Sequence, residues 1–317
     1  MGFDRRLIAI IIVALSLVAP AAFCAAAVLV PAPSRPALAL VTIAAGAWIG
    51  LLWQTNWWGF TAPWVRWLWP VLLALVTGLR FWHFTPAAAS TGALGVALAL
   101  LLLAAAILLL VPAVRARRHP GLAVELAFPL AGGRFLVTDG GDGARSFLLN
   151  YHYGFGTHRA SGVSASMRYA MDVVEVGRIW GEARGFLPRR NAAFRIWERP
   201  LHAPCDGRVA RVVGDVEDNA AFGSHRPYGL GNHVIISRPD GTCVVLGHLR
   251  RGSVAVSEGE TVRAGQVLGR VGNSGWTERP HLHMQAMRSV TGDWWHGEPL
   301  PMRFAGRFLI RNQLYRA

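Results

Sequence analysis

The chain has 317 residues, 53% of them hydrophobic, and a formal net charge of +14 at pH 7, so it is long enough for two domains. All 32 basic residues are arginine, and the absence of lysine excludes a carrier module that attaches biotin or lipoate to lysine. No zinc-finger, homeodomain or aromatic RNA-binding signature accompanies the positive charge, so we expect no nucleic-acid partner.

The first part of the chain, residues 1–114, has the composition of a membrane domain. Asp4 is its only acidic residue, and eight of the 13 tryptophans lie between Trp48 and Trp82, as in an interfacial aromatic belt. Four apolar stretches can be marked in it: Leu7–Val30, Ala37–Trp53, Trp67–Leu79 and Thr91–Val111. We therefore expect a cell-membrane protein with three or four transmembrane helices.

The lengths of these stretches decide how many of them span. The last has 21 uncharged residues, enough at 1.5 Å per residue for a hydrocarbon core of roughly 30 Å. The first exceeds the apolar core of about 7 to 15 residues found in signal peptides, so we interpret it as a retained span. The third has only 13 residues between Arg66 and Arg80, which cover about 20 Å of helix. Three and four spans therefore both stay open.

The number of spans determines on which side of the membrane the C-terminal domain lies. Arginines precede the first stretch and follow the last, at positions 5, 6, 115, 117 and 118. Under the positive-inside rule four spans satisfy both clusters and leave the C-terminal domain in the cytoplasm. Three spans would place the C-terminal domain outside the cytoplasm, although the arginines after the last stretch favour the cytoplasmic side.

Beyond a polar linker at residues 115–121 the pattern changes to short apolar runs separated by glycine, proline and aspartate. The run Gly207–Val213 and the turn signals Asp206-Gly207 and Asp240-Gly241 are typical of hairpins. We expect an all-β domain over residues 122–300, an antiparallel sandwich or barrel, and a basic tail over residues 301–317.

Histidines and one aspartate stand out in these predicted strands. His281 and His283 are two residues apart, so on a strand they project from the same face. Asp172 interrupts an apolar strand, where a charged carboxylate is costly unless it is paired or coordinated, and His248 follows another apolar run. Such a set predicts a metal site, although Asp172 could instead pair with one of the many arginines.

Five motifs in order, LHAPCDGRV, GNHVII, GTCVVLGHL, VSEGETVRAGQVLGRVGNSG and PHLHMQ, resemble those of the lysostaphin-like zinc metallopeptidases. With FPLAGGRFLV and RYAMD the resemblance covers most of residues 125–290. It implies the duplicated hybrid fold of that family, a Zn²⁺ ion held in part by Asp172 and His283, and catalytic roles for His281 and His248. We assign proton transfer to His281 and oxyanion stabilisation to His248. The implied activity is endopeptidase cleavage of peptidoglycan cross-links or of a protein.

The chain departs from the family at the first zinc ligand. The family's His-x-x-x-Asp motif would place a histidine at residue 168, but this chain has Arg168, which has no lone pair for zinc. The sequence resembles a branch with an upstream Asn-x-His, so we propose His152 as the third ligand and His158 as the second choice.

The missing motif histidine also suggests an alternative, a peptidase-like domain that has lost activity and serves as a binding or regulatory module. The three cysteines form no metal-ligand cluster, and a Cys205–Cys243 disulfide stays open.

Overall fold

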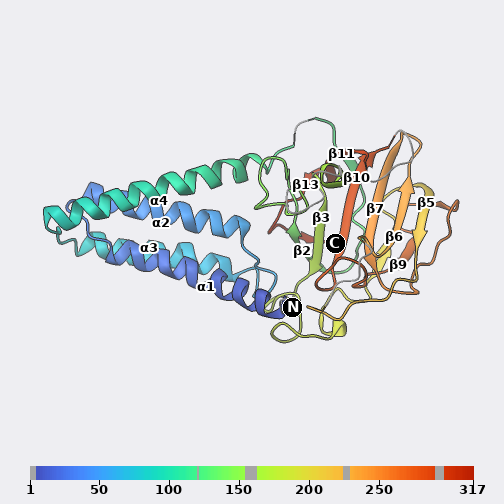
Figure 1. Cartoon of the computed structure of the whole chain (residues 1–317), viewed down its shortest axis with the longest axis horizontal. Helices are drawn as coiled ribbons and strands as arrows, with labels where there is room; N and C mark the ends of the chain where they lie inside the picture. Colours follow the sequence, from blue (N-terminus) through green and yellow to red (C-terminus); the bar gives the residue numbers. More distant parts are fainter. Residues whose placement is uncertain (1–4, 120, 154–162, 224–228, 290–295) are drawn as a thin grey trace.

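A computed structural model describes residues 5–119, 121–153, 163–223, 229–289 and 296–317. Long helices form the N-terminal part of the chain, and strands form the C-terminal part (Figure 1). The predicted division into an N-terminal helical region and a C-terminal antiparallel sheet domain is confirmed.

Four helices are long and apolar enough to cross a membrane: α1 (Arg5–Leu29), α2 (Arg35–Thr55), α3 (Leu68–Trp82) and α4 (Ala89–Arg115). The third candidate span runs over 18 residues because the short 3-10 helix η1 (Val65–Trp67) leads directly into α3. Arg80 lies inside α3, and its guanidinium donates to the carbonyls of Ala27 and Val30, both at 2.5 Å, where α1 ends. A cation at a helix C-terminus is stabilised by the helix dipole, so α3 continues past this arginine to the end of the candidate span Val65–Trp82.

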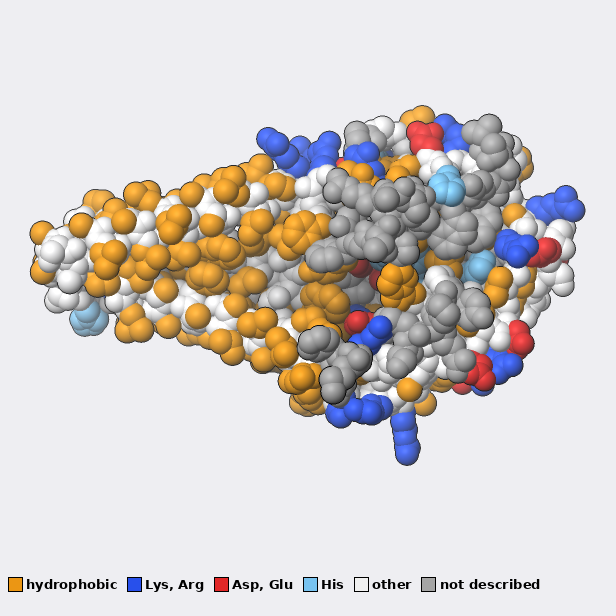
Figure 2. Space-filling model, in the orientation of Figure 1, with side chains coloured by type: hydrophobic (Ala, Val, Ile, Leu, Met, Phe, Trp, Pro, Cys, Tyr) orange, Lys and Arg blue, Asp and Glu red, His pale blue; other side chains and the backbone are white. Residues whose placement is uncertain are grey.

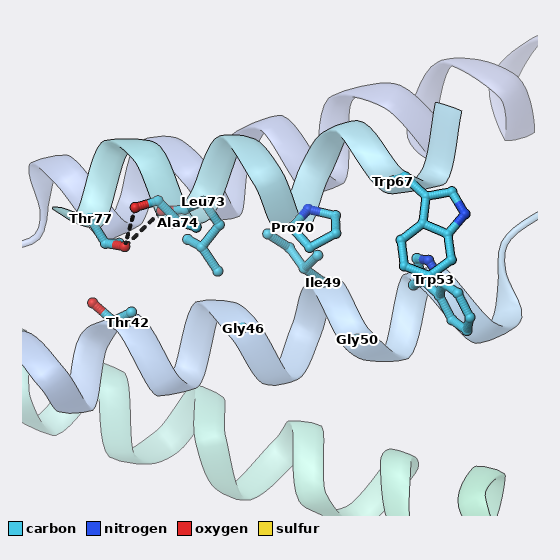
Figure 3. A pocket seen from close by; sticks show the side chains of 10 residues that line it. All are labelled: Thr42, Gly46, Ile49, Gly50, Trp53, Trp67, Pro70, Leu73, Ala74 and Thr77. Atoms are coloured by element: carbon cyan, nitrogen blue, oxygen red, sulfur yellow. Dashed lines mark hydrogen bonds between the residues drawn. The ribbon is translucent and has the colours of Figure 1, made fainter. Parts of the chain in front are cut away.

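The helices pack through small residues and leave a groove between α2 and α3. A Cβ atom on Gly95 of α4 would come within 2.1 Å of the Pro31 carbonyl oxygen, so only glycine lets α4 pass the turn between α1 and α2. Between α2 and α3 lies a groove of about 560 Å³ (Figure 3). Gly46 and Gly50 line it, and a Cβ on Gly50 would project into open space, since it would meet no atom within 4 Å. The hydroxyl of Thr77, also in the lining, donates to the Leu73 carbonyl of its own helix, so the groove is mainly apolar.

One long sheet forms the frame of the C-terminal domain. Its strands follow the order β14-β2-β3-β10-β7-β6-β5-β8, and β11 pairs with β10. The bounds are β2 (Arg134–Asp139), β3 (Met171–Glu175), β5 (Gly207–Val213), β6 (Asn232–Ser237), β7 (Thr242–Leu249), β8 (Thr261–Val262), β10 (Leu282–Arg288), β11 (Glu298–Leu300) and β14 (Leu314–Arg316). Neighbouring strands in the sheet are antiparallel. The central strands β3, β10 and β7 are therefore held on both sides.

Two smaller sheets and the core complete the domain. β4 (Pro200–His202) pairs with β9 (Val267–Arg270), and β1 (Val124–Leu126) pairs in parallel with β12 (Met302–Phe304), which also pairs with β13 (Arg307–Phe308). The largest core cluster joins Phe135, Val173, Leu246 and Met284 from four strands. Full burial of such side chains contributes about 1.5–3 kcal/mol each, which fixes the relative positions of these strands.

The basic C-terminal segment also contributes strands to the domain. Residues 301–317 supply β12, which pairs with β1, β13, which pairs with β12, and β14, which pairs with β2. Arg311 and Asn312 lie between these strands and are almost completely buried. Strands of two or three residues carry too little alternation to be recognised from sequence.

The helices and the C-terminal domain are in direct contact (Figure 1). Just beyond α4, the Ala116 carbonyl accepts a hydrogen bond from the Asp142 amide at 2.9 Å. The turn between α2 and α3 also bonds to the domain, since Arg66 Nη1 donates to the Asn312 carbonyl at 2.6 Å and the Glu182 amide donates to the Gly59 carbonyl at 2.9 Å. The domain is therefore docked on the ends of the helices.

Candidate metal centre

The central strands bring the predicted site residues together. β3 and β10 are antiparallel with Asp172 directly opposite His283, and on the other side of β10 His283 lies opposite Gly247 of β7. His281, two residues before His283, shares its face of the sheet. Two elements distant in sequence thus place one carboxylate and two imidazoles side by side.

His248 reaches the same site through an unusual backbone conformation. Gly247 is paired with His283, so in a regular strand the next residue, His248, would project from the opposite face. His248 instead has φ 63°, in the left-handed region, and its ring lies 4.7 Å from the His281 ring and 5.7 Å from the His283 ring, centroid to centroid. Left-handed residues other than glycine cost conformational energy and concentrate at functional sites.

His152 completes the cluster from the loop between β2 and β3. Its Nε2 lies 3.2 Å from Asp172 Oδ1, and His283 Nδ1 lies 3.0 Å from the same oxygen. Among the described residues, His152, Asp172 and His283 form a group whose potential ligand atoms all lie within 4.8 Å of one another. Ligand atoms around a tetrahedral zinc ion are separated by about 3.3 Å, given bonds of about 2.0–2.1 Å, so the spacing and the two-nitrogen, one-oxygen donor set fit zinc.

Each histidine in the cluster has one ring nitrogen bonded to a fixed acceptor outside it. His152 Nδ1 lies 3.1 Å from Asn150 Oδ1, and His283 Nε2 lies 3.1 Å from Gln285 Oε1. His281 Nδ1 donates to the Arg279 carbonyl at 2.9 Å, and His248 Nδ1 donates to the Ser274 carbonyl at 2.8 Å. In the neutral form of His152, His248 and His283, with the proton on that nitrogen, the other ring nitrogen presents a lone pair toward the cluster.

Asn150 and Asp139 hold His152 in place. Asn150 is fully buried, and its Nδ2 donates to the carbonyls of Gly141, Arg168 and Ala170 at 3.0–3.1 Å, so the amide cannot rotate freely. Asp139 Oδ2 lies 3.6 Å from His152 Nδ1, and Asp139 Oδ1 accepts the Tyr151 amide at 2.8 Å. Sequence reasoning gave neither residue a role, although Asn150 belongs to the Asn-x-His pattern.

The electrostatics of the cluster arise from burial and close opposite charges. Burial opposes ionisation of Asp172, but His152 and His281 outweigh it and hold the pKa of Asp172 well below its ordinary value. Burial lowers the pKa of His152, yet Asp172 and Asp139 raise it to a net value of about 9. Burial, with help from His281 and His283, holds the pKa of His248 well below its ordinary value, so its ring is neutral at pH 7.

The remaining candidates lie apart from the cluster or outside the described residues. Arg168, which replaces the family's motif histidine, forms a bidentate ion pair with Asp142 at 2.7 and 2.8 Å. His158 lies outside the described residues. Cys205 and Cys243 do not form the disulfide that the sequence allows, and both are free, buried thiols.

The turn between α2 and α3 supports the cluster from the side of the helices. Arg279, whose carbonyl orients His281, pairs with the buried Glu182 at 2.5 Å, and its guanidinium lies 4.5 Å from the centre of the Phe60 ring. The guanidinium of Arg311, 3.8 Å from Asp139, lies 5.3 Å from the Trp57 ring. Phe60 and Trp57 of the helical region thus contact two arginines that themselves contact His281 and Asp139.

Comparison with protein families matches residues 195–295 to peptidase family M23. Solved structures similar to the chain include lysostaphin, with 28% identity over 31% of this chain and 35% of that chain (TM-score 0.24). A zinc-containing peptidase from Vibrio cholerae is 17% identical over 61% of this chain and 39% of that chain (TM-score 0.31). The catalytic domain of the M23 protein EnpA from Enterococcus faecalis is 20% identical over 54% of this chain and 92% of that chain (TM-score 0.30).

The match to the first two of these structures extends over little more than a third of their length. Comparison with curated proteins gives no match to the chain.

Proposed function

Because this chain contains a domain of the lysostaphin-like M23 peptidase family, we propose that it is a membrane-anchored zinc endopeptidase that acts on peptidoglycan cross-links or on a protein. The observation that carries the proposal is the convergence of His152, Asp172 and His283 next to two further histidines. The proposal includes the finer fold assignment, the hybrid of sandwich and barrel typical of that family, and a multi-pass position in the cell membrane.

We propose His152 Nε2, Asp172 and His283 Nδ1 as the zinc ligands. When bound there, zinc supplies a water of lowered pKa and a positive charge beside the scissile carbonyl. Asn150 and Gln285 orient the two imidazoles through their other nitrogens, as such partners generally do for metal-binding histidines. His152 takes the place of the missing motif histidine, which argues against the inactive alternative.

The hydrogen bonds favour a division of labour opposite to the one assigned from sequence. His248 has its proton on Nδ1 and a neutral ring, so its Nε2 is positioned to accept a proton from the attacking water. His281 Nε2 faces Asp172 Oδ2 at 3.3 Å, a contact that favours a donor on that nitrogen. We therefore propose that His248 accepts the proton and that His281 donates to the oxyanion.

Zinc content and turnover of the full chain, purified in detergent, test these roles. Alanine at His152, Asp172 or His283 should abolish stoichiometric zinc binding, whereas His158→Ala should retain it. Alanine at His248 or His281 should leave zinc bound and lower the hydrolysis of cross-linked muropeptides by about 10²–10⁴-fold.

His202→Ala is the matched control, because His202 lies in β4 with its Nδ1 near the Pro129 carbonyl at 3.3 Å, and it should keep both zinc and activity. Retention of zinc by His152→Ala would refute the ligand assignment. Full-length protein that folds but binds no zinc would instead support the inactive, regulatory module.

A further inference from the structure

One loop of the C-terminal domain has the composition of a membrane-surface segment. Residues 178–190, here the 178–190 loop, read RIWGEARGFLPRR. Ile179, Trp180 and Phe186 are 65%, 71% and 59% exposed. The arginines at 178, 184, 189 and 190 are also exposed, while the one acidic residue, Glu182, is buried against Arg279. The exposed surface of this loop is therefore apolar and cationic.

The loop lies at the depth where two candidate spans begin. Trp64 Nε1 donates to the Ile179 carbonyl at 2.9 Å, and Trp64 directly precedes the candidate span Val65–Trp82. Arg6 Nε, in the first turn of α1, donates to the Leu187 carbonyl at 3.1 Å. Both ends of the loop are thus bonded to residues at the ends of membrane-spanning helices.

A second contact on another side of the helices has the same character. The loop at residues 143–148 forms a groove with Leu108 and Leu109 of α4, and its Phe147 is 44% exposed. Arg145 lines the same groove. Figure 2 shows hydrophobic side chains covering the helices and arginines gathered where the helices meet the C-terminal domain. Apolar and cationic side chains therefore lie together at more than one place along the junction between the helices and the C-terminal domain.

We propose that the 178–190 loop is a membrane-contact surface, which places Ile179, Trp180 and Phe186 in the interfacial layer of the bilayer around this chain's own helices. Aromatic and aliphatic side chains flanked by arginines are typical of segments that lie at the headgroup boundary. The exposed arginines bind anionic lipid headgroups. The proposal rests on the proposed membrane insertion of the helices and not on peptidase activity.

This surface lies close to the candidate metal centre. The loop directly follows β3, which carries Asp172, and Glu182 within it holds Arg279, whose carbonyl orients His281. Lipid contact would therefore fix the height and tilt of the C-terminal domain through residues next to the cluster.

Fluorescent probes attached to single cysteines test the proposal in the full chain. The background carries alanine at Cys24, Cys205 and Cys243, and the protein is reconstituted into phosphatidylglycerol nanodiscs. Probes at Trp180→Cys and Phe186→Cys should be quenched by nitroxide-labelled lipids and protected from aqueous iodide. Val267→Cys is the matched control, since Val267 is 48% exposed on β9 at the far end of the domain (Figure 1), and it should show the reverse.

A second arm tests the arginines. The triple variant with glutamine at Arg178, Arg184 and Arg190 should lower lipid quenching at position 180 in phosphatidylglycerol to the level found in phosphatidylcholine. The same change at Arg208, Arg211 and Arg263, which are exposed on or beside β5 and β8, should not.

Probes at 180 and 186 that behave like the probe at 267 would overturn the proposal, whether the loop faces water or another protein. Unchanged zinc content in these variants separates this outcome from a failure of the proposed enzymatic function.

Discussion

The ligand geometry of His283 depends on Gln285. His283 Nδ1 faces Asp172 while its Nε2 lies 3.1 Å from Gln285 Oε1, and Gln285 is buried with 1% exposure. Loss of such an acceptor typically lowers metal affinity by about 10–100-fold, because the ring is no longer held in one tautomer and orientation. We therefore expect Gln285→Leu to weaken zinc binding by this factor in a competition titration with a chelator.

Gln285→Glu serves as the control, because a carboxylate at this position still accepts the hydrogen bond from Nε2. It should keep zinc affinity near that of the unmodified protein. Equal zinc affinity in the leucine and glutamate variants would show that this hydrogen bond has no part in positioning His283.

A histidine outside the cluster gives a pH-dependent prediction. His233 is buried in β6 and donates from Nδ1 to the Gly231 carbonyl at 2.8 Å. Burial, aided by Arg211, lowers its pKa below the ordinary value of 6.5, so the unfolded chain takes up the proton more readily than the folded one. Its contribution to stability is complete above about pH 6.5 and is lost as the pH falls below that value.

Thermal unfolding curves at pH 7.5 and 5.0 check this sign. The unfolding temperature should fall more between the two values in the unmodified protein than in His233→Gln, which cannot be protonated there. Parallel shifts in the two proteins would mean that His233 contributes nothing to acid sensitivity.

Residue chemistry explains which parts of the candidate site were predictable. The spacing of His281 and His283 and the carboxylate at Asp172 inside an apolar strand are local signals, and the register of β3 with β10 brings these residues together. Asp139 and Gln285 act through contacts that sequence does not encode locally. His248 points into the site because its own backbone is left-handed at the end of β7. The two-residue alternation of a strand does not predict such a conformation.

At the scale of elements, the hairpins were predictable from sequence, but the packing of the helical region against the C-terminal domain was not. β5 runs over Gly207–Val213, as the sequence indicates, and Gly241, with φ 80°, forms the turn between β6 and β7 at the expected Asp-Gly pair. The turn between α2 and α3 gave no sign that it packs beside the candidate metal centre. That contact depends on close backbone approach between segments more than 100 residues apart, such as Gly59 and Glu182.

Gly181 permits this approach and provides a test of it. A Cβ atom there would lie 2.2 Å from the Gly59 carbonyl oxygen and 2.4 Å from that of Thr61, and both are backbone atoms that no rotamer change can move. Gly181→Ala should therefore lower the free energy of unfolding by about 1–3 kcal/mol and reduce turnover with zinc still bound.

Gly214→Ala is the matched control, since its Cβ would meet only Val254 side-chain atoms at 3.6 and 3.7 Å. It should be near neutral in denaturant unfolding and in activity. Wild-type stability and turnover in Gly181→Ala would show that the turn between α2 and α3 is not needed by the site.

At the scale of the whole molecule, the contacts of the helix ends determine the parity of the spans. α1 begins beside the C-terminal domain, where Arg6 bonds to Leu187, and α4 ends there, where Ala116 bonds to Asp142. If the helices span the bilayer, both the N-terminus of α1 and the C-terminal domain lie on one side, which requires an even number of crossings. The arginines flanking α1 and α4 then favour the cytoplasmic side, whereas a peptidoglycan substrate requires the opposite one.

Cysteine labelling in intact cells with a membrane-impermeant maleimide measures both the parity of the spans and the side of the membrane on which the C-terminal domain lies. Val267→Cys on β9 and a cysteine-bearing tag before α1 should be accessible from the same side of the membrane. Thr85→Cys, exposed between α3 and α4, should be accessible from the other side. A tag and Val267→Cys on opposite sides would contradict the four-span arrangement. Labelling of Val267→Cys from outside would favour the wall peptide as substrate, and labelling only after lysis would favour a cytoplasmic protein, because the candidate metal centre and β9, which carries Val267, belong to the same domain.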